Sequence, residues 1–388
     1  MITRRHFVMS SAASLAIAKK SRAAARRKIL IVLIDGFGPE YVQKSDMPNL
    51  KRLKREGAFK FGLDVIPSVT NVNNTSLVTG SFPKDHGVTT NYYYDPKTKK
   101  GIEMESADFV LKPTIFERAH ALGLRTALVT SKDKVRTLCG RGADIQVSAE
   151  MPDQKYVGLI GKQENMYSPQ VNYWSLRAAR HVLKNESVDL MYLSTTDYMM
   201  HTYAAEEAPS LEHLHTLDKL LGEIVDDHPG VELYLTADHG MNRKDKGIDA
   251  ARILKADSIS AVAIATVRDK HVVHHQNMGG SCYVYLERKA DLPRAVELLK
   301  ATPGVTEIYE GAEAARLFQL YPTRVGDLLL LAAKDTVFGN LDQPLQEVKV
   351  RSHGSRFEQE VPLLVYGRKV DIDTYKYNLD LTRKLSLE

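Results

Sequence analysis

The sequence predicts an α/β fold, with a mostly parallel central sheet and helices on both of its faces. Four runs rich in apolar and β-branched residues show no polar alternation, which is typical of parallel strands buried on both faces; they span 28–34, 125–130, 188–194 and 231–236. Segments with helical spacing of apolar residues lie among these runs, at 47–56, 115–122, 171–183 and 210–225. Strands that alternate with helices in this way favour a sheet covered on both faces.

Residues 251–346 have a different pattern and predict a small α+β cap. Strand-like runs at 282–286, 305–309 and 327–332 accompany a helical pattern, which indicates a β-α-β unit with further strands. The cap lies between two segments that carry candidate site residues. We therefore expect residues 26–250 and 347–388 to form one α/β domain, with the cap inserted before its last site segment.

Residues 1–25 predict a twin-arginine export signal. Arg4 and Arg5 precede a weakly apolar stretch at 8–18, and the alanines at 23–25 suit a signal peptidase. A membrane span needs roughly 20 apolar residues, so we expect no stable membrane anchor. The expected protein is exported, with a periplasmic location, and meets the twin-arginine machinery during transport. A short amphipathic or disordered N-terminus is the alternative.

The composition narrows the class of protein. Hydrophobic residues make up 43% of the chain and charged residues 26%, which excludes a wholly disordered or collagen-like protein. The formal net charge of +5 equals the basic excess of the predicted leader, so the rest of the chain is neutral. A nucleic-acid partner is not expected, because it requires clustered positive charge on the folded part. The two cysteines, Cys139 and Cys282, allow at most one disulfide.

Polar residues follow all four predicted strands of the main domain. Asp35, the turn at 131–134, Asp197 and Asp238 each come directly after one of them. Ligands bind at the carboxyl ends of the strands in such sheets, so we expect these residues to share one site.

Three histidines belong to the same pattern. His201 follows Asp197 at a spacing of i, i+4, which places both side chains on one helical face. His239 follows Asp238 directly, and His353 lies beyond the cap. Three carboxylates and three imidazoles form a suitable ligand set for two divalent ions of the zinc type.

In order and local motif, these residues resemble the alkaline phosphatase superfamily, and within it the nucleotide pyrophosphatase/phosphodiesterase branch. The resemblance extends from residue 28 to about residue 367. It implies two Zn²⁺ ions per subunit, one held by Asp197, His201 and His353 and the other by Asp35, Asp238 and His239, with Thr70 as a further ligand and the nucleophile. Metal coordination lowers the pKa of a hydroxyl that is otherwise a poor nucleophile.

The motif around Thr70 indicates which group within this branch the sequence resembles most. Residues 70–74 read Thr-Asn-Val-Asn-Asn, whereas the diesterases commonly have Thr-Phe-Pro-Asn-His, and the sequence here is similar to that of the phosphonoacetate hydrolases. That similarity implies that Asn91 stabilises a phosphoryl oxygen and that Lys132 and Lys134 bind the carboxylate of the substrate. Two ammonium groups would stabilise the enediolate that forms when a C–P bond breaks.

The leading hypothesis is a dizinc hydrolase that cleaves the C–P bond of phosphonoacetate, or of a close phosphonate, to acetate and phosphate. The first alternative is an exported phosphodiesterase or nucleotide pyrophosphatase, and a non-catalytic exported binding protein is the second. Single residues also have interpretations without a function. Lys132 and Lys134 could be solvated surface residues, and Asn91 could be a turn residue. His274 and His275 of the cap could face the substrate, although we favour a surface or packing role.

Overall fold

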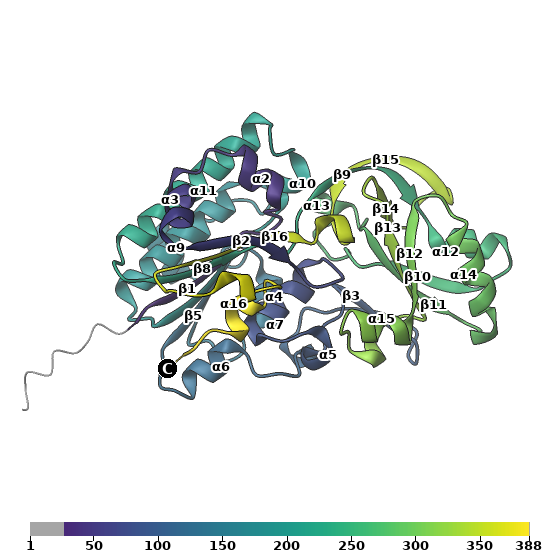
Figure 1. The fold of residues 1–388 in the computed structure, drawn as a ribbon, viewed down its shortest axis with the longest axis horizontal. Helices are drawn as coiled ribbons and strands as arrows, with labels where there is room; N and C mark the ends of the chain where they lie inside the picture. Colours follow the sequence, from purple (N-terminus) through teal and green to yellow (C-terminus); the bar gives the residue numbers. More distant parts are fainter. Residues whose placement is uncertain (1–26, 388) are drawn as a thin grey trace, which may run out of the picture.

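The computed structural model describes residues 27–387, so the predicted export signal lies outside the described residues. The chain forms two lobes (Figure 1). The larger lobe contains a seven-stranded sheet with the order β2-β16-β8-β1-β7-β5-β6. The strands are β1 (Ile29–Leu33), β2 (Ala58–Leu63), β5 (Thr126–Thr130), β6 (Ile145–Ser148), β7 (Leu190–Ser194), β8 (Glu232–Thr236) and β16 (Glu360–Tyr366).

The sheet is mostly parallel, as predicted. Strands β8, β1, β7, β5 and β6 pair in parallel, and β16 is antiparallel to both of its neighbours. The four strands predicted from apolar runs lie side by side in the order β8-β1-β7-β5. Leu33 pairs with Ser194 on one side and with Thr236 on the other, so the carboxyl ends of these strands are level.

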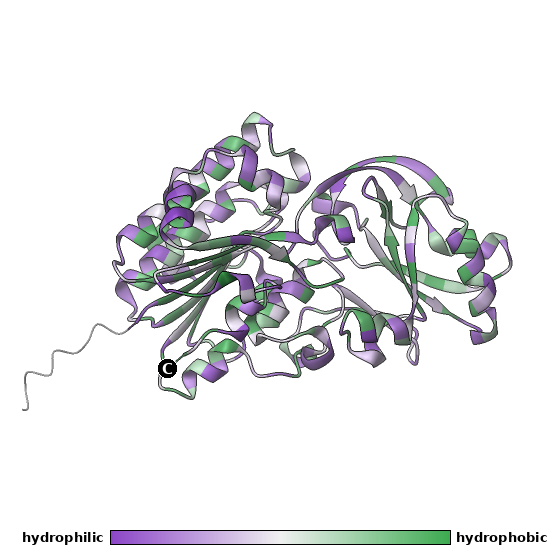
Figure 2. Ribbon diagram, viewed as in Figure 1, coloured by the Kyte–Doolittle hydropathy of each residue, from purple (hydrophilic) through white to green (hydrophobic). Residues whose placement is uncertain are grey.

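Helices cover both faces of this sheet (Figure 1). One face carries α3 (Pro48–Glu56), α9 (Gln170–Asn185) and α11 (Ala208–Asp226), and the other carries α4 (Thr70–Thr79), α6 (Ile115–His120), α7 (Asp133–Cys139) and α16 (Asp380–Arg383). Apolar residues concentrate in the strands, whereas the helices present polar residues outward (Figure 2). The predicted α/β class is therefore confirmed. Among residues 27–387, no helix combines the length and apolar character that crossing a membrane requires.

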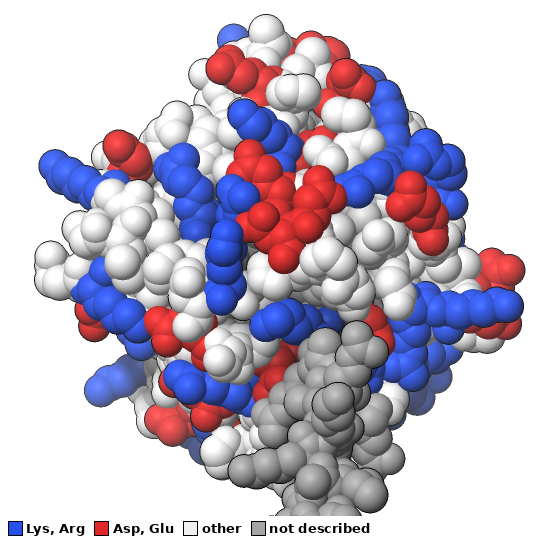
Figure 3. All heavy atoms as spheres, turned by 90° about the vertical axis from the view of Figure 1, so that its left-hand side faces the viewer, with Lys and Arg blue, Asp and Glu red and all other residues white. Residues whose placement is uncertain are grey.

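Short elements complete the larger lobe. The helices are α2 (Pro39–Lys44), α5 (Pro83–His86), α8 (Gln154–Ile160) and α10 (Tyr198–Thr202). The strands β3 (Tyr92–Asp95) and β4 (Lys100–Glu103) form a hairpin that packs against the smaller lobe, where Tyr94 contacts Tyr285. On the face shown in Figure 3, basic and acidic side chains are interspersed. This distribution matches the neutral formal charge of the chain after its first 25 residues.

The smaller lobe is built on a four-stranded antiparallel sheet with the order β10-β11-β13-β12. Its elements are β10 (Ala261–Ala265), α13 (Val272–His275), β11 (Ser281–Leu286), α14 (Leu292–Lys300), β12 (Val305–Glu310), α15 (Gly311–Leu317) and β13 (Leu328–Ala332). The predicted β-α-β unit is β11-α14-β12, and β13 lies between its two strands. The structure therefore contains a split β-α-β unit, in which β13 is inserted between β11 and β12.

A three-stranded sheet connects the lobes. It consists of β9 (Asn242–Ile248), β14 (Thr336–Phe338) and β15 (Leu345–Ser352), and α12 (Ala250–Ala256) follows β9. Strands β9 and β15 are antiparallel, and Asn242 pairs with Ser352. The chain therefore leaves the larger lobe just after His239 and returns just before His353, so this pairing brings the two histidines together.

A buried ion pair stabilises the junction between the three-stranded sheet and the larger lobe. Lys244 Nζ donates to Glu358 Oε1 at 2.8 Å, and both side chains are fully buried. The other carboxylate oxygen of Glu358 accepts hydrogen bonds from the backbone and side chain of Ser355. The carbonyl of Glu358 accepts from Gly240 N at 2.6 Å, next to His239. One residue thus fixes both histidine-bearing segments.

Replacing Lys244 by Met should lower the free energy of unfolding by about 3–5 kcal/mol, because it leaves the carboxylate of Glu358 buried without a countercharge. Lys246→Met is the matched control, since Lys246 lies on the same strand and its ion pair with Asp335 is exposed. Denaturant unfolding of both variants measures the difference. Equal stabilities for the two variants would show that the buried pair does not hold the connection.

Candidate active site

The candidate site lies at the carboxyl edge of the central sheet. Asp35 follows β1 by two residues, Lys132 follows β5 by two, Asp197 follows β7 by three and Asp238 follows β8 by two. Because these strand ends are level, the four side chains converge. All four residues are at most 3% exposed. The structure thus brings together the polar residues that the sequence places after the strands.

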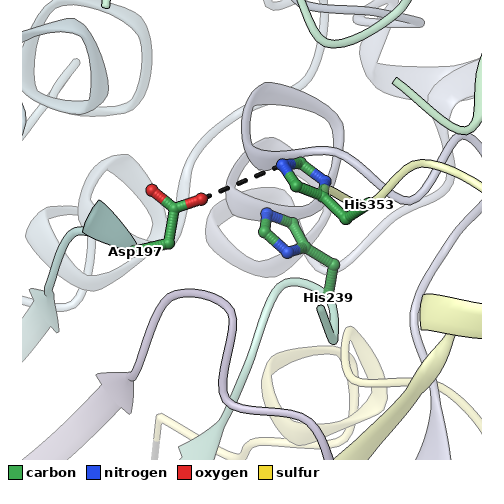
Figure 4. Close-up of side chains that lie close together, drawn as sticks. All are labelled: Asp197, His239 and His353. Atoms are coloured by element: carbon green, nitrogen blue, oxygen red, sulfur yellow. Dashed lines mark ion pairs between the residues drawn. The ribbon is translucent and has the colours of Figure 1, made fainter. Parts of the chain in front are cut away.

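The three histidines come from three different elements. His201 lies on α10, His239 follows Asp238, and His353 follows β15. The rings of His239 and His353 stack with their centroids 3.4 Å apart, and Asp197 points toward both (Figure 4). His201 Nε2 is 2.9 Å and His353 Nε2 is 3.8 Å from Asp197 Oδ2. On the other side, His239 Nε2 is 3.4 Å from Asp35 Oδ1.

A backbone carbonyl orients each of the three imidazoles. His201 Nδ1 lies 2.6 Å from the carbonyl oxygen of Arg351, His239 Nδ1 lies 3.0 Å from that of Gly240, and His353 Nδ1 lies 2.7 Å from that of Ser68. A carbonyl oxygen can only accept, so each Nδ1 carries the proton and each Nε2 presents a lone pair. Histidines that bind metals in proteins are held in this way.

These residues fit a pair of metal ions. Among residues 27–387, two groups of donor atoms lie within 4.8 Å of one another: Asp35, Asp238 and His239 form one, and Asp197, His239 and His353 form the other. Asp35 Oδ1 and His201 Nε2 are buried and make no hydrogen bond. Mixed nitrogen and oxygen donors of this kind suit zinc. His239 belongs to both groups, and His201 joins the second through its contact with Asp197.

Negative charge accumulates in this buried site. Burial, together with the neighbouring carboxylates of Asp197 and Asp238, raises the pKa of Asp35 to about 8. Burial also raises the pKa of Asp238 to about 6. For Asp197, burial acts in the same direction, but the charge of Lys132 opposes it, and the pKa stays well below its usual value. The site therefore favours cations that can offset the carboxylates.

Lys132 supplies one positive charge between the two donor groups. Its ammonium donates to Asp35 Oδ2 at 2.8 Å and to Asp197 Oδ1 at 2.7 Å. Burial lowers the pKa of Lys132, but the attraction of Asp197 and Asp35 is larger and raises it above its usual value. Lys132 therefore stays charged.

Lys134 is held from the smaller lobe. Its ammonium forms a buried ion pair with Asp269, which lies in the segment between β10 and α13. Asp269 also accepts a hydrogen bond from His271 N at 2.7 Å, and its Oδ1 lies 3.0 Å from His275 Nε2. The alternative of solvated lysines is wrong, because Lys132 and Lys134 are 3% and 2% exposed. No sequence signal marks Asp269, since a single loop aspartate has no distinctive pattern.

The cap histidines are also buried beside the site. His274 Nε2 lies 3.3 Å from Thr196 Oγ1, and its ring centroid is 6.1 Å from that of His201. The ring of His275 is 5.9 Å from that of His201. Of the surface or packing role favoured for this pair, the burial of both rings excludes the surface role and agrees with packing. Helix α13, which carries them, packs against α10.

Thr70 occupies the first position of α4, and its Oγ1 lies 3.3 Å from His239 Nε2. The N-terminus of this ten-residue helix carries partial positive charge, which favours an anion next to the hydroxyl. Asn91 Oδ1 accepts a hydrogen bond from Asn71 N at 3.1 Å, in the first turn of the same helix. That contact uses the amide oxygen of Asn91 and leaves its NH₂ group for another acceptor.

Comparison with known proteins places this arrangement in a family. Residues 29–356 match the model of the type I phosphodiesterase / nucleotide pyrophosphatase family. The ectonucleotide pyrophosphatase/phosphodiesterase family member 1 of Homo sapiens is 25% identical over 232 residues, which cover 55% of this chain and 23% of the relative. The venom phosphodiesterase of Naja atra is 27% identical over 55% of this chain and 26% of its own. The chain thus spans about a quarter of the length of these relatives.

Solved structures resemble the whole described chain. The phosphonoacetate hydrolase from Sinorhizobium meliloti 1021 in complex with phosphonoacetate superimposes with a TM-score of 0.84 and 32% identity, over 92% of this chain and 95% of that one. Human ectonucleotide pyrophosphatase/phosphodiesterase 5 has a TM-score of 0.67 and 17% identity over 92% and 93%, which shows a common fold. The chain belongs to the type I phosphodiesterase / nucleotide pyrophosphatase family of the alkaline phosphatase superfamily.

Proposed function

We propose that this protein is an exported dizinc hydrolase that cleaves the C–P bond of phosphonoacetate, or of a close phosphonate, to give acetate and phosphate. The observation that carries the proposal is the pair of buried lysines beside the two candidate metal groups. The 32% identity with a phosphonoacetate hydrolase over 92% of the chain supports it. Export is proposed from the sequence of residues 1–25.

Each candidate residue has a role in this proposal. Asp35, Asp238 and His239 would hold one zinc ion with Thr70, and Asp197, His201 and His353 would hold the other. The bound ions lower the pKa of the threonine hydroxyl and polarise the phosphoryl group. Thr70 Oγ1 forms a bond to phosphorus as the C–P bond breaks, and its proton passes to solvent. Asn91 donates its amide N–H to a phosphoryl oxygen.

In this proposal, Lys132 and Lys134 stabilise the negative charge that develops on the leaving group. The electron pair of the C–P bond moves onto the methylene carbon and into the carboxylate, and a proton from water then gives acetate. Water hydrolyses the phosphothreonine to release phosphate. An ammonium has three N–H donors. Lys132 uses two of them on Asp35 and Asp197, and Lys134 uses one on Asp269, so each keeps a donor for the substrate carboxylate.

A phosphodiesterase or nucleotide pyrophosphatase is the second candidate function. The family match and the names of the curated relatives favour it. A diester has no carboxylate for two lysines to bind, so the two functions differ in what they require of Lys134. A non-catalytic binding protein is less well supported, because all the residues that the proposed reaction needs are present and grouped.

The mature protein should hold about two zinc ions, and Asp238→Ala should lose at least one of them together with nearly all activity, because the ion loses a charged ligand. Metal analysis and phosphate release, measured on the same samples, test this. Wild-type protein that is active without any bound divalent ion would refute the metal assignment.

Thr70→Ala should abolish turnover while the metal content stays close to normal, since most of the coordination comes from aspartates and histidines. Thr70→Ser should keep part of the activity, because the attacking oxygen remains. Rates and metal content of the two variants check this. Full activity of the alanine variant would exclude the covalent mechanism.

Lys134→Ala should lower kcat/KM for phosphonoacetate by about 30- to 1000-fold, which corresponds to roughly 2–4 kcal/mol, because a charge-assisted contact to the enediolate is lost. The loss should be much smaller for an aryl phosphate ester, which has no carboxylate. Steady-state kinetics on both substrates measures the asymmetry.

Equal losses of kcat/KM on both substrates would mean that Lys134 stabilises the fold or attracts anions to the site without recognising the carboxylate. Turnover of bis-p-nitrophenyl phosphate without any hydrolysis of phosphonoacetate would establish the diesterase function instead.

A further inference from the structure

We infer that Asn74 is a positioning residue that ties the backbone of the nucleophile Thr70 to the carboxylate of Asp238, and that Tyr192 fixes the orientation of Asn74. The inference rests on the metal and threonine parts of the proposed function. It does not depend on which phosphonate or phosphate ester is the substrate.

The hydrogen bonds of Asn74 use both ends of its amide. Nδ2 donates to the carbonyl oxygen of Thr70 at 3.0 Å and to Asp238 Oδ2 at 3.3 Å. Oδ1 accepts from the hydroxyl of Tyr192 at 2.8 Å. Asn74 is 1% exposed, and Tyr192, in the middle of β7, is fully buried. The carbonyl oxygen of Thr70 can only accept, so the NH₂ group of the amide faces it, and the hydroxyl of Tyr192 holds the opposite end in place.

These contacts hold the Asp238 carboxylate from two sides. Gly36 N donates to its Oδ1 at 3.2 Å, and Asn74 donates to its Oδ2. A carboxylate with one neutral donor on each oxygen cannot rotate freely, and it keeps further lone pairs for a metal ion. Hydrogen bonds of this kind to a ligating carboxylate commonly contribute 10- to 100-fold in metal affinity.

Other polar residues of α4 have a different role. Thr75 and Thr79 donate to the carbonyl oxygens of residues four positions earlier, and their further contacts are to Cys139 and Ser81 rather than to a candidate metal ligand. Asn74 makes the same kind of bond to Thr70 and in addition reaches Asp238 on another element. This second contact couples the position of the helix N-terminus, and hence of the Thr70 hydroxyl, to the candidate metal ligand.

The test compares three variants of the full mature protein. Asn74→Leu removes the amide at similar volume, and Tyr192→Phe removes a single hydroxyl. Tyr234→Phe is the matched control, because Tyr234 is a buried tyrosine on β8 that also pairs with Ile31, but its hydroxyl donates to Glu232 at the other end of the strand. Zinc affinity is measured by chelator competition, and the absorption spectrum of the cobalt-substituted proteins reports the ligand geometry.

Asn74→Leu should bind one of the two ions about 10- to 100-fold more weakly, with an altered cobalt spectrum. Tyr192→Phe should weaken it about fivefold, the effect of one neutral hydrogen bond. At saturating metal, kcat for p-nitrophenyl phosphate should fall more in Asn74→Leu than in Tyr192→Phe, while KM changes little in both. Tyr234→Phe should match the wild type in affinity, spectrum and kcat.

Wild-type affinity and spectrum in Asn74→Leu would overturn the inference and leave the proposed function intact. A folded wild type that binds no divalent ion would overturn both. If Asn74→Leu does not fold, Tyr192→Phe decides, since it keeps the shape of the side chain. Equal behaviour of Tyr192→Phe and Tyr234→Phe would then refute the coupling.

Discussion

Three aspartates meet in a buried site at the carboxyl edge of one sheet, and their mutual repulsion is the constraint on which the rest of the site depends. Burial removes water that would otherwise solvate the carboxylates, so positive charge must come from the protein or from bound ions. Lys132 provides part of it by bridging Asp35 and Asp197. The three imidazoles, each held at Nδ1 by a carbonyl, surround the same carboxylates with lone pairs that suit divalent cations.

The second lobe takes part in the site. The pairing of β9 with β15 brings His353 back to His239 after more than a hundred residues of intervening chain. Asp269 then reaches from the smaller lobe to Lys134, and α13 places His274 and His275 next to α10. The charge beside the metal groups is thus set by both lobes. Under the proposed function, we expect substitutions in the smaller lobe to alter substrate preference without touching any candidate metal ligand.

Much of this site could be predicted from the sequence, for a local reason. Buried parallel strands leave long apolar runs, and the polar residue that ends each run marks the same edge of the sheet, as Asp35 and Asp238 do. The Asp197–His201 spacing is likewise visible within one helix. Contacts between distant segments leave no such trace: Asp269 lies 135 positions from Lys134, and the strand that splits the β-α-β unit follows it in sequence. For His274 and His275 the choice between a surface and a packing role stayed open for the same reason, because nothing local shows that α13 packs on α10.

We propose that this acidic cluster is a binuclear metal site. The most direct measurement is anomalous diffraction at the zinc absorption edge from crystals of the mature protein grown with zinc. A binuclear site should give two anomalous peaks, one beside Asp35, Asp238 and His239 and one beside Asp197, His201 and His353. A map without a peak at either group, recorded from protein that hydrolyses its substrate, would contradict it.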